Sequence, residues 1–140
     1  MLALFYVGVS AQQPLRVSLP NAPDTVKFMV RGDNLYGSQK PADLVAKFER
    51  PYKPLLDSGV QFYASLGNHD SQTSRFYRPW HMGGERYYTY ARKNVRFFVL
   101  DSNKLDRTQL TWLIGQLKGA TEDWKVAYFH HPLYSSGGRH

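Results

Sequence analysis

The sequence predicts a mixed α/β domain, and three observations support that class. Short apolar runs rich in β-branched and aromatic residues recur along the chain, one segment has helical periodicity, and three of the runs end in polar loops. The chain has 140 residues, which is enough for one domain. With 42% hydrophobic and 15% aromatic residues, it has the composition of a folded globular protein rather than a disordered one.

The chain opens with a short apolar stretch from Met1 to Ala11. The small residues at its end fit the cleavage site of a secretory signal, but no positive charge precedes them, so a processed signal and a buried strand both stay open. The stretch is too short for stable membrane insertion. We expect residues 1–23 to be a signal and lead-in, residues 24–140 to form the domain, and the protein to be extracytoplasmic.

Two strands and one helical pattern are expected in the first half of the domain. Val26–Val30 is apolar and leads into a Gly-Asp loop, and Gln61–Leu66 leads into a second polar loop. Between them, Ala42–Leu56 carries apolar residues at helical spacing. Pro51 and Pro54 should break or kink this helix, since proline lacks the backbone N–H.

The second half predicts a loop, a hairpin and a final strand. Residues 71–86 have no regular pattern, and we expect a loop there. Tyr87–Ala91 and Val95–Leu100 form two apolar runs separated by a short polar turn, which is typical of a hairpin. Lys125–Phe129 is the last predicted strand.

The clearest helix extends from Arg107 to Lys118. Asp106 is placed to cap its first turn with Gln109 three residues later, and Gly119 is a stop signal. Four apolar residues fall at i, i+3, i+4 and i+7 and predict one buried stripe: Leu110, Leu113, Ile114 and Leu117.

Side chains able to bind metals follow three of these strands. They are Asp33, then Asn68 and His69, then His130 and His131. In open α/β sheets, loops at the carboxyl ends of neighbouring strands meet at one crevice. The sequence therefore predicts one site built from distant segments.

Three segments resemble sequence blocks of the calcineurin-like metallophosphoesterase superfamily: Gly32-Asp33-Asn34-Leu35-Tyr36, Gly67-Asn68-His69-Asp70 and Phe129-His130-His131-Pro132. They look like three of its five ordered blocks, and the GD-x-x-Y form is that of the purple acid phosphatase-like branch. The resemblance implies a partial metallophosphoesterase β-sandwich flanked by helices. It also implies hydrolysis of phosphate monoesters at a binuclear metal site, with phosphodiesters as the alternative.

The resemblance assigns metal ligands. Asp33 would bridge the two ions, Asn68 and His130 would bind one of them, and Tyr36 would be a phenolate ligand that favours ferric iron. Two ions of Fe, Zn or Mn are expected in complete members. The alternatives are purely structural roles. Asp33 would then lie in an ordinary turn, Tyr36 would only pack on the sheet, and His130 would be a core histidine.

The resemblance also assigns catalytic roles. His69 would protonate the leaving oxygen or stabilise the transition-state charge, and Asp70 would orient it. Apart from the resemblance, the glycine-rich segment at residues 135–140 is suited to cradle phosphate through backbone N–H groups, with Arg139 or His140 reaching the ester, although a flexible end accounts for that segment equally well. His131 is expected not to bind metal, and His81 is expected at the surface.

Two blocks of the family pattern have no counterpart in this sequence. The opening D-x-H or D-x-G block is absent, so Asp33 fills either the first or the second block, and the closing G-H-x-H block is absent too. We therefore expect an impaired site that holds at most one ion. Apolar surface meant for further strands predicts self-association through an exposed sheet.

The net charge and the residue composition bear on functions other than hydrolysis. The formal net charge is +7, but no recognised nucleic-acid-binding motif accompanies it, so we expect a small phosphorylated substrate and no nucleic acid. An inactive fragment with weak metal binding is the second hypothesis. The absence of cysteine excludes thiolate-bound metals and disulfides.

Overall fold

The computed structural model describes residues 26, 28, 33–134 and 136. The predicted signal, most of the predicted strand Val26–Val30, and both Arg139 and His140 lie outside the described residues. Within the part of the chain that is described, none of the helices has the length and apolar character needed to cross a membrane.

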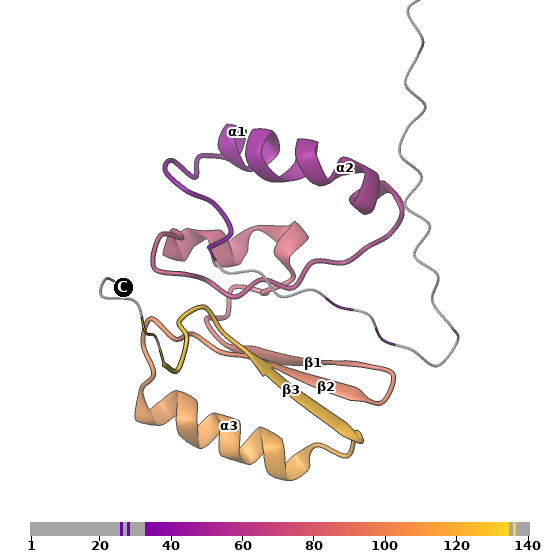
Figure 1. Ribbon diagram of the computed structural model, residues 1–140, viewed down its shortest axis with the longest axis vertical. Coiled ribbons are helices and arrows are strands. Elements are labelled where there is room, and N and C mark those ends of the chain that lie inside the picture. The colour runs from indigo at the N-terminus through magenta and orange to yellow at the C-terminus, as the bar shows by residue number, and fades with distance from the viewer. Residues whose placement is uncertain (1–25, 27, 29–32, 135, 137–140) are drawn as a thin grey trace, which may run out of the picture.

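A three-stranded mixed sheet forms one half of the structure (Figure 1). β1 (Tyr88–Arg92) pairs antiparallel with β2 (Val95–Val99), and β3 (Trp124–Tyr128) pairs parallel with β2. The register runs from Tyr88 opposite Val99 in the first pair, and from Val95 opposite Trp124 in the second. The predicted hairpin and last strand are confirmed to within one residue, and with the helices they make the predicted mixed α/β class.

Helix α3 (Arg107–Gly119) connects β2 to β3 and lies on one side of the sheet (Figure 1). Its predicted cap is confirmed, since the Asp106 side chain accepts a hydrogen bond from the Gln109 backbone. The predicted buried stripe is wrong. Leu110, Ile114 and Leu117 are 47%, 54% and 40% exposed, and only Leu113 of the predicted four is half-buried.

The helix is instead turned so that Gln109 is fully buried. Its amide donates to the carbonyls of Asp101 and Lys104 at 3.1 and 3.0 Å and accepts from the Asp101 N–H at 2.8 Å. These bonds satisfy the backbone where the chain leaves β2, which helical periodicity alone does not reveal. Three apolar side chains of α3 are therefore exposed, and the predicted self-association through the sheet stays a prediction.

The helical segment on the other side of the sheet is continuous from Pro41 to Asp57 (Figure 1). It consists of α1 (Pro41–Leu44), a π-helical turn η1 (Val45–Glu49) and α2 (Arg50–Asp57). The predicted break at the prolines does not occur, but regular α-helical geometry is interrupted beside them. The wider π turn directly precedes α2, where Pro51 has no N–H to donate to the preceding turn.

Two predictions for the connecting segments also fail. Residues 61–66 form no strand, because the sheet contacts them through side chains instead of a backbone ladder: Ser65 Oγ donates to the Leu100 carbonyl and Tyr88 Oη to the Ala64 carbonyl. Residues 71–86 are not simply loop, since they contain two 3₁₀ helices, η2 (Gln72–Phe76) and η3 (Arg78–Trp80).

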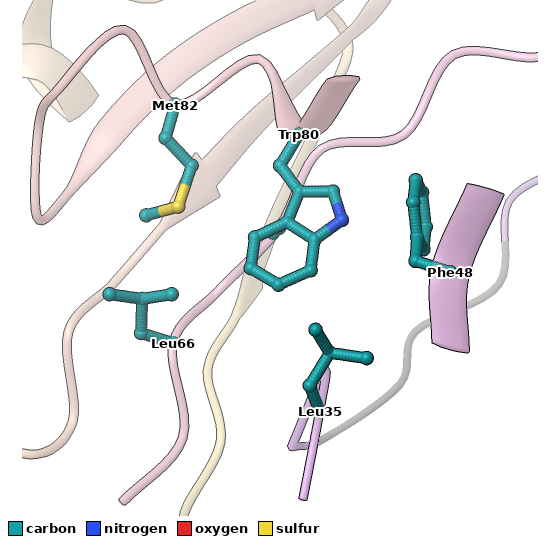
Figure 2. Packing of buried hydrophobic residues seen from close by; sticks show 6 residues of the cluster. Leu35, Phe48, Leu66, Trp80 and Met82 are labelled. Atoms are coloured by element: carbon teal, nitrogen blue, oxygen red, sulfur yellow. The ribbon is translucent and has the colours of Figure 1, made fainter. Parts of the chain in front are cut away.

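The main core lies between α1–α2 and these connecting segments. Figure 2 shows Leu35, Phe48, Leu66, Trp80 and Met82 packed together, all 6% exposed or less. Phe48 meets Trp80 edge to face, with ring centroids 5.7 Å apart. Because Leu35 and Leu66 each stand close to a polar loop, this cluster holds both loops in place.

Replacing Gln109 by alanine should lower the free energy of unfolding by about 2–4 kcal/mol, because buried backbone groups that lose their partner cost about 1–3 kcal/mol each. Urea denaturation followed by circular dichroism measures the change. Gln116→Ala is the matched control, since Gln116 is exposed on the same helix. Equal stability of the two variants would show that the buried amide bonds do not stabilise the fold.

Candidate functional site

Three loops bring Asp33, Asn68 and His130 together. His130 Nε2 lies 2.8 Å from Asn68 Oδ1 and 3.3 Å from Asp33 Oδ1. His130 lies shortly after the end of β3 at Tyr128, and Asn68 lies shortly after residues 61–66. The sequence-based prediction that distant polar loops meet at one place is met for these three residues.

Gly67 makes this close approach possible. A Cβ placed on Gly67 would lie 1.9 Å from Asp33 Oδ1 and 2.9 Å from His130 Nδ1. Neither contact is compatible with a real side chain, so any other residue would push the carboxylate or the imidazole away. The glycine of the Gly-Asn-His-Asp motif thus has a packing role at the site itself.

Asp33 is held in a costly arrangement. It is buried, and its backbone has a φ of 28°, in the left-handed region that residues other than glycine rarely adopt. Its Oδ1 atom is buried and makes no hydrogen bond among the described residues, although His130 Nε2 lies 3.3 Å away. A buried carboxylate oxygen without a hydrogen bond is unfavourable, and a cation bound at this point would satisfy it.

The donor set fits one cation. A carboxylate oxygen, an amide oxygen and an imidazole nitrogen suit first-row metals such as Zn, Mn or Fe. No group of three His, Cys, Asp or Glu side chains that could hold a metal occurs in the described part of the chain. This finding is consistent with the trio, because its third donor is an asparagine.

The hydrogen bonds of His130 fix its protonation. Nδ1 accepts the backbone N–H of Asp33 at 3.2 Å, so the proton of the neutral ring is on Nε2, facing Asn68 Oδ1. A neutral imidazole binds a metal through the nitrogen that lacks the proton. Coordination through Nε2 therefore requires the proton to move to Nδ1 and the Asp33 amide to be released.

Asp70 ties two of the loops together. Its Oδ2 accepts the N–H of Gly67 at 2.9 Å and both the backbone N–H and the side-chain amide of Asn34, and its Oδ1 accepts the N–H of Leu35. The family resemblance implied that Asp70 orients His69. In the structure its hydrogen bonds hold the loop backbones, and the orienting role stays a prediction.

His69 and Tyr36 lie side by side at the exposed edge of the site. Their ring centroids are 5.0 Å apart, and both side chains are exposed. A hydrogen bond to Asp33, followed by the negative charge of that carboxylate, raises the pKa of Tyr36, because the bond is lost when the phenol ionises. Tyr36 thus contacts the predicted metal ligand, and its own role as a ligand stays a prediction.

Two further residues shape the site and were not predicted. The Gln39 amide donates to the His69 carbonyl at 2.8 Å and accepts the Ser71 N–H at 2.7 Å, which fixes the turn that carries His69. Ser102 Oγ accepts the His131 N–H at 3.0 Å and lies 2.9 Å from His131 Nδ1. Neither residue belongs to a recognisable motif, so only the folded arrangement identifies them.

Comparison with known proteins decides the family. The model of the calcineurin-like phosphoesterase family matches residues 13–140. The chain belongs to this family.

A relative narrows the assignment to a branch of the family. The chain is 35% identical over 51 residues to an Arabidopsis thaliana protein named probable inactive purple acid phosphatase 14. The match covers 36% of this chain and 12% of that protein, so the chain spans a small part of its relative's length. The similarity supports the purple acid phosphatase-like branch predicted from the GD-x-x-Y block. No solved structure matches the chain.

Replacing Gly67 by alanine should weaken binding of Zn²⁺ at least about tenfold, equivalent to about 1.4 kcal/mol, because the new methyl group must displace Asp33 or His130. Calorimetric titration measures the affinity. Gly115→Ala is the control, since a Cβ there meets no atom within 4 Å. Unchanged affinity of Gly67→Ala would show that the donors do not depend on this contact.

Proposed function

We propose that this calcineurin-like phosphoesterase chain contributes to metal-dependent hydrolysis of phosphate monoesters. The observation that carries the proposal is the convergence of three donor atoms, with His130 Nε2 within 3.3 Å of both Asp33 Oδ1 and Asn68 Oδ1. The family match supports phosphoester hydrolysis as the reaction. The substrate class is a small phosphorylated molecule, and the location is extracytoplasmic.

Asp33, Asn68 and His130 would hold the cation. A bound cation of this kind supplies Lewis acidity and a nucleophile near neutral pH. Asp33 contributes the only carboxylate of the trio, and a hydrogen bond to it, followed by its negative charge, raises the pKa of Tyr36. In a ferric form of the protein Tyr36 is the candidate phenolate ligand.

His69 is the candidate general acid. It is exposed at the tip of the loop that Asp70 and Gln39 fix from two sides, so it can reach a substrate without moving the trio. Protonation of the departing oxygen by a side chain at this position lowers the barrier to P–O cleavage. The Tyr36 ring packs against the imidazole and limits its orientations.

A second candidate function is cation binding with little or no turnover. The trio supplies donors for one ion, whereas the two-metal mechanism needs two ions roughly 3.5–4 Å apart. The relative's name, probable inactive purple acid phosphatase 14, favours this alternative by similarity. A second ion would need donors beyond Asp33, Asn68 and His130. The choice among Fe, Zn and Mn depends on such further donors as well.

Asp33→Asn should weaken cation binding at least about tenfold, because an amide replaces the charged donor. Elemental analysis after dialysis, with calorimetric titration of Zn²⁺ and Mn²⁺, measures both stoichiometry and affinity. Asp57→Asn is the matched control, since Asp57 is exposed and pairs with Lys53 on α2. Equal metal content in the Asp33 variant and the wild type would exclude Asp33 as a ligand.

His69→Ala should leave the bound metal unchanged and slow hydrolysis of an aryl phosphate about 10²–10⁴-fold, as expected for loss of a general acid. Initial rates with added Fe, Zn or Mn test this. Gln116→Ala is the control, since Gln116 is exposed on α3 and belongs to none of the loops that form the site. Loss of metal in the His69 variant would show that His69 is a ligand, and turnover absent even in the wild type would favour cation binding alone.

A further inference from the structure

A second pocket lies away from the candidate metal site, around the two 3₁₀ helices. It has a volume of about 430 Å³, within the range of small-molecule pockets. It is lined by residues of η2, η3 and the glycine turn that follows them, and none of the trio, Tyr36 or His69 is among them. Its chemistry is therefore independent of the proposed metal centre.

Two of the lining residues carry positive charge. Arg75 and Arg78 both contribute to the wall, and none of the described residues that line it is a carboxylate. Neither arginine forms a salt bridge with any of the described residues, in contrast to Arg86 and Arg96, which do. Two guanidinium groups without a carboxylate partner in the described part of the chain indicate a place for an anionic ligand.

The pocket also offers an aromatic wall. Phe76 is 64% exposed although it is a large apolar residue, and the guanidinium of Arg75 lies 5.0 Å from its ring centroid. Gly84 lies against the ring so closely that a Cβ would be 2.8 Å from it. Phe76 is thus held in place with its ring accessible, which suits stacking against a flat group of a ligand.

One residue beside the pocket has a strained backbone. His81 has a φ of 51°, which residues other than glycine rarely adopt, whereas Gly83 and Gly84 take φ values of 64° and 87° without strain, and the Gly84 N–H donates to the Arg75 carbonyl at 3.0 Å. His81 Nδ1 is fixed by the carbonyls of Phe62 and Pro79 at 2.9 and 3.2 Å. Strained backbone that surrounding contacts hold in place is characteristic of ligand sites.

We propose that this pocket binds a small anion that carries an aromatic ring, with its phosphate, phosphonate or carboxylate group on Arg75 and Arg78 and its ring on Phe76. Both parts of the ligand contribute, because the anionic group makes charge-assisted hydrogen bonds to the guanidinium groups and the ring packs against Phe76. Removing either part should therefore weaken binding at least about tenfold.

The test is calorimetric titration of the full chain with phenylphosphonate, which no phosphatase activity can hydrolyse, and with methylphosphonate as the ring-free probe. Phenylphosphonate should bind at least about tenfold more tightly than methylphosphonate. Arg78→Gln, at an exposed position, should weaken phenylphosphonate at least about tenfold. Arg50→Gln, which removes the same charge from exposed α2, should bind as wild type.

Two further variants separate this site from the metal centre and from misfolding. Asp33→Asn should leave phenylphosphonate affinity unchanged, and Phe76→Ala should weaken it while leaving methylphosphonate unaffected. If Arg78→Gln does not fold by circular dichroism, Phe76→Ala decides the test. The proposal is overturned by equal affinity for the two probes, by wild-type affinity in Arg78→Gln, or by lost binding in Asp33→Asn, which would place the ligand at the metal site.

Discussion

The candidate site depends on the hydrogen bonds that the Asp70 carboxylate accepts. A single buried side chain accepts hydrogen bonds from Gly67, from Asn34 and from Leu35. These residues come from two loops that are more than thirty positions apart in the sequence. If the carboxylate were absent, three backbone N–H groups would lose their acceptor, which costs about 1–3 kcal/mol each when such groups are buried. The position of Asp33 beside His130 follows from this tie.

Polar side chains repeatedly take the place of backbone pairing in this protein. Gln109 satisfies the backbone of Asp101, and Tyr88 and Ser65 connect the sheet to residues 61–66. Such bonds hold segments at fixed positions without a strand ladder, since buried backbone groups need partners of any kind. Within the described residues the sheet has three strands, and side-chain hydrogen bonds rather than further strand pairing hold the neighbouring segments.

Local signals in the sequence predicted the elements whose stability is local. The hairpin, the cap at Asp106 and the last strand follow from alternation and capping chemistry, and the structure has all of them. The prediction of a buried stripe on α3 was wrong, because periodicity finds an apolar face but cannot tell which face of the helix meets the sheet. The hydrogen bonds of Gln109 place that residue, not the leucines, in the buried position. The strand at 61–66 was wrong because pairing partners are set by the tertiary fold.

The same distinction applies to the site. The motifs predicted Asp33, Asn68 and His130 as one site, because metal-capable residues after apolar runs form a recognisable pattern. Gln39 and Ser102 carry no pattern, since their roles exist only once distant loops have met. The family resemblance assigned Asp70 to His69. The folded chain directs its oxygens to the opposite loop instead.

Gln39 also connects the candidate metal site to η2. One end of its amide donates to the His69 carbonyl, and the other accepts from both the Ser71 N–H and Ser74 Oγ at 2.7 and 2.8 Å. Ser74 is buried in η2 directly before Arg75, one of the two arginines of the proposed anion pocket. The Gln39 amide therefore fixes the turn that carries His69 and the start of η2 together, because both depend on the same side chain for their hydrogen bonds.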